Sequence, residues 1–154
     1  MSEFRNLLIQ PFFIVCLLVV GVMIPGAHAL EVPPLKGRVN DTARILSSSS
    51  VQMLDQTLQT LEQNESTQIV VLTIPSLEGE SLEQFTLKVV ETWKIGQKGT
   101  DNGALLFIAA KDRKIRIETG YGLEGKLTDL VAGRIISESM VPAFRQGNYD
   151  QGDN

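Results

Sequence analysis

The order of apolar and polar residues along the chain predicts three helices. In residues 51–63 apolar side chains recur three and four positions apart, which places them on one face of a helix, and Ser47–Ser50 supply N-cap candidates. Ser81 and Gln84 fit a capping box that opens a second amphipathic helix to about residue 94. Thr128 is a suitable cap for a third helix to about Met140, which Pro142 is expected to stop.

Three other segments have the composition of strands. Residues 68–74 and 104–110 are continuous apolar runs, typical of strands covered on both faces, whereas residues 114–119 alternate in the manner of a half-exposed strand. The first two strands flank a helix and should therefore be parallel, while the last two form an antiparallel hairpin. This order predicts an α/β fold, a three-layer α/β/α sandwich with a short mixed sheet. Residues 37–41 are interpreted as a turn-rich approach to the first helix.

The first 29 residues are interpreted as a signal peptide that precedes the domain. Arg5 supplies a positive start, Leu7–Ile24 is almost wholly apolar, and Ala27-His28-Ala29 matches a cleavage site. The alternative is an uncleaved membrane anchor, since a run of this length can just span a bilayer. Residues 30–36 then form an extended leader, because Pro33-Pro34 excludes a helix there, and residues 37–154 form the domain.

The amino-acid composition excludes several kinds of catalytic and metal site from the domain that follows the predicted signal peptide. The single cysteine, Cys16, and the single histidine, His28, both lie in the predicted signal peptide. Thiolate or imidazole catalysis and the usual zinc sites therefore have no residues to use, whereas Ca²⁺ or Mg²⁺ with oxygen ligands remains open. The formal net charge of −4 argues against a nucleic-acid partner.

Oxygen-bearing side chains are expected to meet at one end of the sheet. Asp101 and Asn102 precede the central strand, and the loop 120–124, with Glu124, follows its antiparallel partner. Hairpin geometry puts both loops at the same end, near Asp129 at the start of the third helix. These ligands suit Ca²⁺ or Mg²⁺. The alternatives are that Asn102-Gly103 is only a turn and that Asp129 only complements a helix dipole.

Signatures of common enzymes are missing from the sequence. It contains no phosphate loop of the Gly-x-x-x-x-Gly-Lys-[Ser/Thr] type and no Gly-x-Ser-x-Gly nucleophile elbow. A hydrolase built on this chain would have to be metal-assisted, with a cation that polarises a phosphate and activates water.

Six ordered motifs resemble those of the TPM domain family, over nearly all of residues 37–152. They are Gly37-x-Val39-Asn40-Asp41, Trp93-Lys94-Ile95-Gly96, Asp101-Asn102-Gly103-Ala104-Leu105-Leu106, Asp112-Arg113-Lys114-Ile115-Arg116-Ile117, Gly120-Tyr121-Gly122-Leu123-Glu124-Gly125 and Pro142-Ala143-Phe144-Arg145-Gln146-Gly147-Asn148-Tyr149.

The resemblance implies an exported or membrane-tethered α/β/α domain of bacterial envelopes or the thylakoid lumen. It also implies one of several activities: acid phosphatase activity, a part in photosystem II repair, or modulation of membrane partners. Calcium near the acidic loops is implied as well, with Mg²⁺ less favoured. Carried over by motif, the metal-site residues are Asp101, Asn102, Glu124 and Asp129, with Asp41 as a weaker candidate.

The resemblance also carries an expectation for the C-terminal segment. In the family, the region matching residues 147–152 leads into a further helix, whereas this sequence stops at Asn154. It is interpreted as either a truncated reading frame or a minimal form without the closing helix.

Three hypotheses for function follow. The first is an accessory or interaction module of the envelope, with a membrane or envelope protein as partner and Ca²⁺ at the acidic rim. The second is a metal-assisted acid phosphatase for small phosphomonoesters. The third is a structural domain or fragment without a ligand.

Overall fold

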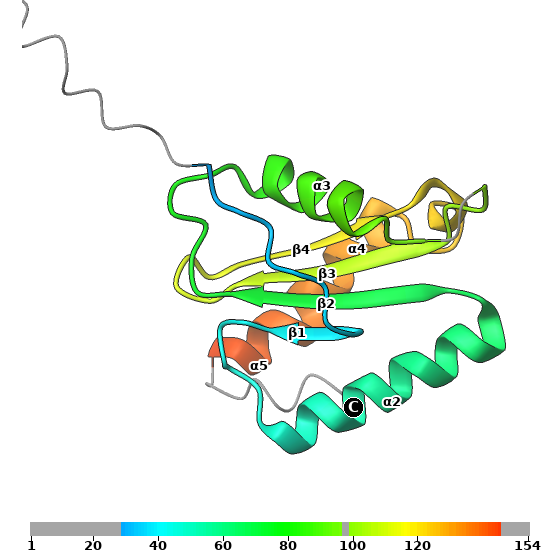
Figure 1. Cartoon of the computed structure of the whole chain (residues 1–154), viewed down its shortest axis with the longest axis horizontal. Coiled ribbons are helices and arrows are strands. Elements are labelled where there is room, and N and C mark those ends of the chain that lie inside the picture. The colour runs from blue at the N-terminus through cyan, green and yellow to red at the C-terminus, as the bar shows by residue number, and fades with distance from the viewer. Residues whose placement is uncertain (1–28, 97–98, 146–154) are drawn as a thin grey trace, which may run out of the picture.

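The computed structural model describes residues 29–96 and 99–145 (Figure 1). The elements are β1 (Val39–Asp41), α2 (Ser48–Glu65), β2 (Gln68–Ile74), α3 (Leu82–Trp93), β3 (Gly103–Ala109), β4 (Lys114–Thr119), the short 3₁₀ helix η1 (Tyr121–Leu123), α4 (Asp129–Ile135), the π-helical turn η2 (Ile136–Met140) and α5 (Val141–Arg145). The predicted signal peptide, apart from Ala29, and the segment from residue 146 onward lie outside the described residues. Within the described part, no helix combines the length and the apolar character needed to cross a bilayer.

The sheet is the predicted mixed one. Its strands lie in the order β1-β2-β3-β4, with β1, β2 and β3 parallel and β4 antiparallel to β3. In the register, Leu72 of β2 lies beside Phe107 of β3, which in turn lies beside Arg116 of β4. The β2-α3-β3 unit and the β3-β4 hairpin are both confirmed, and with them the α/β class.

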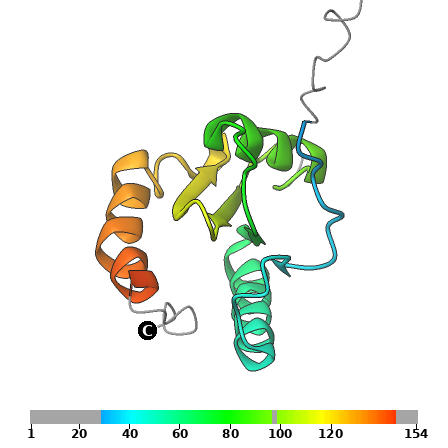
Figure 2. The same ribbon diagram turned by 90° about the vertical axis from the view of Figure 1, so that its left-hand side faces the viewer.

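Helices cover both faces of the sheet (Figure 2). Helix α3 lies on one face, while α2 and the run from α4 to α5 lie on the other. On the α3 face, the rings of Phe85 and Phe107 meet at 5.6 Å between centroids with an interplanar angle of 57°, and both side chains are fully buried. The buried cluster around them consists of Leu72, Ile74, Leu77, Phe85, Val89, Leu105, Phe107 and Ala109.

The predicted leader is extended and packs against the domain. The Trp93 indole N–H donates to the carbonyl oxygen of Pro33 over 2.8 Å, and the Lys88 ammonium donates to the carbonyl of Leu30 over 2.7 Å. The side chains of Leu30 and Val32 pack against the core of the α3 face. The leader therefore covers part of this core, and Trp93 packs against the core with its one polar atom bonded.

Strand β1 corrects the interpretation of residues 37–41 as a turn-rich approach. Val39–Asp41 pair with β2 in parallel, and the side chain of Asn40, only 5 % exposed, donates to the carbonyl of Gly37 over 2.8 Å. A strand of three residues is too short to show a periodicity of its own. It forms because β2 already offers an unpaired edge.

Pro142 does not stop the third helix, contrary to the prediction. The helix passes from α4 through the π-helical turn η2, where the N–H of Val141 bonds to the carbonyl of Ile136, and continues as α5. Pro142 is then the second residue of a new α-helical segment. A missing N–H is tolerated in a first turn, so the proline ends one hydrogen-bonding pattern without ending the helix.

The core pair on the α3 face gives a test of this packing. We expect Phe85→Ala to lower the free energy of unfolding by about 3–5 kcal/mol, because it removes a buried aromatic ring and leaves a cavity. Urea denaturation measures this loss. Leu87→Ala on the same helix is the control, because Leu87 is 50 % exposed and its loss should cost little. An equal loss in both variants would contradict the assignment of the buried face.

Candidate functional site

The two loops predicted to meet are joined backbone to backbone at one end of the sheet. The N–H of Gly120 donates to the carbonyl oxygen of Gly103 over 2.7 Å, and the N–H of Gly122 donates to that of Asp101 over 3.1 Å. In Figure 1 this junction lies at the right-hand end of the sheet, where β3 begins and β4 ends. The prediction that the loops share one end of the sheet is confirmed.

Glycine is required at this junction because the two backbones touch. A Cβ atom built on Gly122 would overlap the carbonyl oxygen of Thr100, and one built on Gly120 would overlap that of Asp101. A Cβ on Gly103 would lie only 2.6 Å from the backbone nitrogen of Gly96. The glycines thus allow close approach of three chain segments, a use distinct from positive φ.

Three of the predicted carboxylates lie at this end. Asp101, Glu124 and Asp129 are all exposed, and Asp101 has a left-handed backbone with φ of 45°. Asp129 is the first residue of α4, whose N-cap Thr128 accepts a hydrogen bond from the N–H of Val131. We call Asp101, Glu124 and Asp129 the acidic rim.

Apolar side chains are exposed next to the acidic rim. Tyr121 is 81 % exposed and Leu130 is 73 % exposed. Of the seven large hydrophobic residues that are exposed in the described part of the chain, four come from residues 121–135. In the sequence, the position of Tyr121 between two glycines is consistent with an exposed side chain. Leu130 fits the apolar periodicity of a helix, so its exposure could not be predicted.

Asn102 has a structural role in the same loop. Its side-chain N–H₂ donates to the carbonyl oxygen of Ser66, its side-chain oxygen accepts from the hydroxyl of Thr100 over 3.0 Å, and its backbone carbonyl accepts from the N–H of Gln68 over 3.0 Å. The residue ties the loop to the end of α2 and the start of β2. Its side-chain oxygen, the atom that would bind a metal, accepts one hydrogen bond here and keeps a second lone pair.

Asp41 lies at the other end of the sheet. It pairs with Thr73 of β2, which lies beside Ile108 near the end of β3, whereas Asp101 precedes the start of β3. Its carboxylate accepts from the N–H groups of Ile45 and Leu46 over 3.2 and 3.0 Å. Asp41 therefore holds the turn after β1 and does not share a site with the acidic rim.

The positions of the acidic side chains do not form a closed metal cage. Across residues 29–96 and 99–145, no three side chains of His, Cys, Asp or Glu are grouped closely enough to hold an ion. A cation at the rim would have to complete its shell with backbone carbonyls and water, as Ca²⁺ does in many sites.

Among the described residues, the three groups with shifted pKa values, Glu83, Asp112 and Arg116, are not members of the acidic rim. A hydrogen bond to Glu118, at 2.6 Å, raises the pKa of Arg116, and the carboxylate of Glu118 also accepts from the hydroxyl of Thr86 on α3. A hydrogen bond from the N–H of Leu77 lowers the pKa of Asp112. The pKa of Glu83 is lowered by its own backbone N–H and by the Ser81 hydroxyl at the start of α3. These groups fix the hairpin and α3 against each other.

The fold and the glycine junction identify the chain as a small α/β/α domain with exposed acidic loops at one end of its sheet. The TPM domain family matches residues 39–153, and the chain belongs to this family. No functionally curated protein matches the chain.

Three solved structures are similar to the chain. The N-terminal domain of a protein from P. gingivalis is 39 % identical, with a TM-score of 0.69 over 74 % of this chain and 73 % of that one. The N-terminal domain of the cg2496 protein from Corynebacterium glutamicum is 19 % identical, with a TM-score of 0.59 over 82 % and 80 % of the two chains. The BA42 protein from Bizionia argentinensis is 20 % identical, with a TM-score of 0.59 over 70 % and 72 %. At these identities, the last two show the fold alone.

The loop junction can be tested with a matched pair of glycines. We expect Gly122→Ala to lower the free energy of unfolding by about 1–3 kcal/mol, because the new methyl group forces the two loops apart. Gly125→Ala in the same loop is the control, since a Cβ there meets nothing within 4 Å. Urea denaturation compares the two. Equal stability of both variants would show that the loops do not touch at Gly122.

Proposed function

We propose that this chain is an accessory domain of the cell envelope that binds a membrane or envelope protein through its acidic rim and the apolar residues beside it. The observation that supports this most directly is the exposure of Tyr121, on a loop joined to its neighbour by backbone hydrogen bonds, and of Leu130 in the first turn of α4, close in sequence to Glu124 and Asp129. Exposed aromatic side chains on a preorganised surface are typical of interaction sites.

The sequence before the domain supports the proposed envelope location. The positive start, the apolar run Leu7–Ile24 and the Ala-x-Ala site have the order of an export signal. A domain whose mature part contains neither cysteine nor histidine also needs no oxidative folding outside the cytoplasm.

Calcium is the proposed ligand of the rim. Asp101 and Glu124 belong to the two loops joined at Gly120 and Gly122, so a cation bound at this end of the sheet would take a carboxylate ligand from each loop. Ca²⁺ accepts irregular shells of carboxylates, carbonyls and water, whereas Mg²⁺ demands a near-ideal octahedron. Ca²⁺ bound here would offset two of the three negative charges of the rim and leave Tyr121 and Leu130 as the dominant contact.

Calcium binding can be measured by thermal unfolding of the purified protein. We expect Ca²⁺ to raise the melting temperature, because binding to the folded state alone stabilises it by about 2.7 kcal/mol at one hundred times the dissociation constant. Asp101→Asn and Glu124→Gln should each reduce this rise. Asparagine is well suited to position 101, since it tolerates the left-handed backbone found there.

Glu138→Gln is the matched control, because Glu138 is an exposed carboxylate on the helical run remote from the loops. The proposed calcium site is contradicted if Ca²⁺ does not raise the melting temperature, or if the rise is unchanged in both rim variants. Hydrolysis of an aryl phosphate that requires Ca²⁺ and is lost in Asp101→Asn would instead favour a metal-assisted phosphatase.

The interaction itself can be tested by site-specific photo-crosslinking in the intact envelope. A photoreactive residue in place of Tyr121 should yield a discrete crosslink to a membrane or envelope protein, and Asp101→Asn with Glu124→Gln should weaken it. The same residue in place of Leu87, 50 % exposed on α3, is the control. Equal crosslinking from both positions would contradict a specific surface at the rim.

A further inference from the structure

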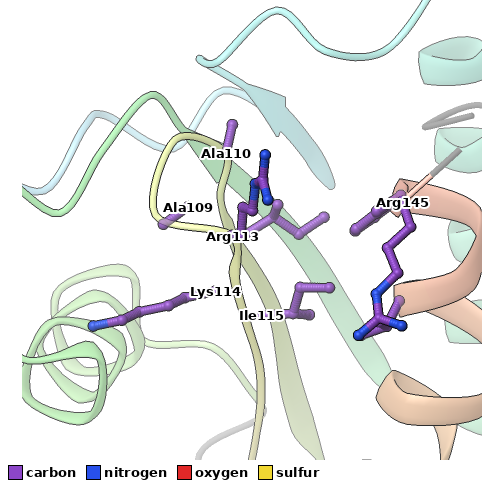
Figure 3. Close-up of a pocket in the computed structure, with 9 residues that line it drawn as sticks. Ala109, Ala110, Arg113, Lys114, Ile115 and Arg145 are labelled. Atoms are coloured by element: carbon purple, nitrogen blue, oxygen red, sulfur yellow. The ribbon is translucent and has the colours of Figure 1, made fainter. Parts of the chain in front are cut away.

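A cavity lies at the end of the sheet opposite the acidic rim. It has a volume of about 380 Å³ and lies between the β3–β4 hairpin and α5 (Figure 3). This volume is within the range of small-molecule sites, roughly 300–1,000 Å³. Arg145, which contributes to it, is on the last turn of α5.

The floor of the cavity is apolar. Ile108 and Ile115 are cross-strand neighbours in the β3–β4 pairing, and both line the cavity. Val141 and Phe144 of α5 line it from the helix. An aromatic ring and branched aliphatic side chains favour a ligand with an apolar ring or chain.

Two guanidinium groups flank this apolar floor from different elements. Figure 3 shows Arg113 on the hairpin and Arg145 on α5, with their guanidinium groups pointing in opposite directions. Lys114 also lines the cavity, but its ammonium end points away from it toward α3. Lys114 belongs to the α3 face because it pairs with Ala109, a member of the core on that face. The cationic groups at the cavity are therefore Arg113 and Arg145.

Neither arginine forms an ion pair within the described part of the chain, where the salt bridges are Arg38–Glu62 and Arg116–Glu118. Asp112 is the carboxylate next to Arg113 in the sequence. It accepts a hydrogen bond from the backbone N–H of Leu77 over 2.9 Å. Arginine recognises carboxylate and phosphate oxygens with two parallel N–H donors, so two unpaired guanidiniums favour an anionic ligand.

We propose that this cavity binds a small organic anion, with its apolar body against Ile108, Ile115 and Phe144 and its carboxylate or phosphate group attracted by the positive charges of Arg113 and Arg145, which flank the cavity on two sides. The proposal is independent of the acidic rim, since the two sites lie at opposite ends of β3 and carry opposite charge.

The test is an NMR titration of the purified protein with phenylphosphonate and with benzoate. Phenylphosphonate lacks a hydrolysable ester, so binding is measured apart from any phosphatase activity. We expect saturable shifts at the amides of Ile108, Ile115 and Phe144. Benzyl alcohol, which keeps the ring without the charge, and inorganic phosphate, which keeps the charge without the ring, should each bind at least about tenfold more weakly.

Substitutions then assign the two arginines. Arg113→Asn and Arg145→Gln should each raise the dissociation constant about tenfold, the effect of losing one charge-assisted hydrogen bond. Asparagine fits position 113, whose φ is 53°. Lys111→Gln is the matched control, because it removes the same charge from the same turn and Lys111 does not line the cavity.

A change of less than twofold is expected for Lys111→Gln. The proposal is overturned if neither anion shifts these amides, if benzyl alcohol binds as tightly as the anions, or if Lys111→Gln weakens binding as much as the arginine variants. Circular dichroism of each variant checks that the fold is kept.

Discussion

Pairing of strand β3 on both of its edges is the constraint on which the rest of the structure depends. Gly103–Ala109 pair with β2 in parallel and with β4 in antiparallel, and five of the side chains on this strand are at most 5 % exposed. A strand buried on both faces must satisfy its backbone within the sheet, which fixes both neighbours in register. That register carries the loop 96–103 to the loop 120–125 at one end and places the hairpin under α5 at the other.

The two ends of β3 therefore differ in chemistry while sharing one scaffold. Seven residues of strand span about 20 Å at the rise of an extended chain, whereas charges in physiological salt are screened beyond about 8 Å. The carboxylates at the rim and the arginines at the cavity thus act as separate electrostatic sites. The proposed anion at the hairpin end and the proposed cation at the rim would therefore bind without competing, and neither would require the other.

The sequence was sufficient wherever a physical signal was local. Continuous apolar runs identified β2 and β3, and Ser81 and Thr128 marked the starts of α3 and α4. It failed where tertiary pairing decided the outcome. Val39–Asp41 become a strand only because β2 has a free edge, and Pro142 is accommodated because η2 shifts the hydrogen-bonding pattern of the helix. Asn102 is a residue type suited to metal binding, but its partners on Ser66 and Thr100 could be known only from the fold.

The same reasoning explains why the acidic rim could be predicted and the cationic cavity could not. Asp101 and Glu124 are joined by a hairpin whose ends must meet, so strand order alone brings their loops together. Arg113 and Arg145 come from a turn and from a helix that approach each other only because the chain continues past Pro142. A helix that stopped at residue 141 would leave Ile108 and Ile115 uncovered and remove one of the two guanidiniums. The continuation through η2 into α5 is thus the feature that covers this part of the sheet face and forms the cavity.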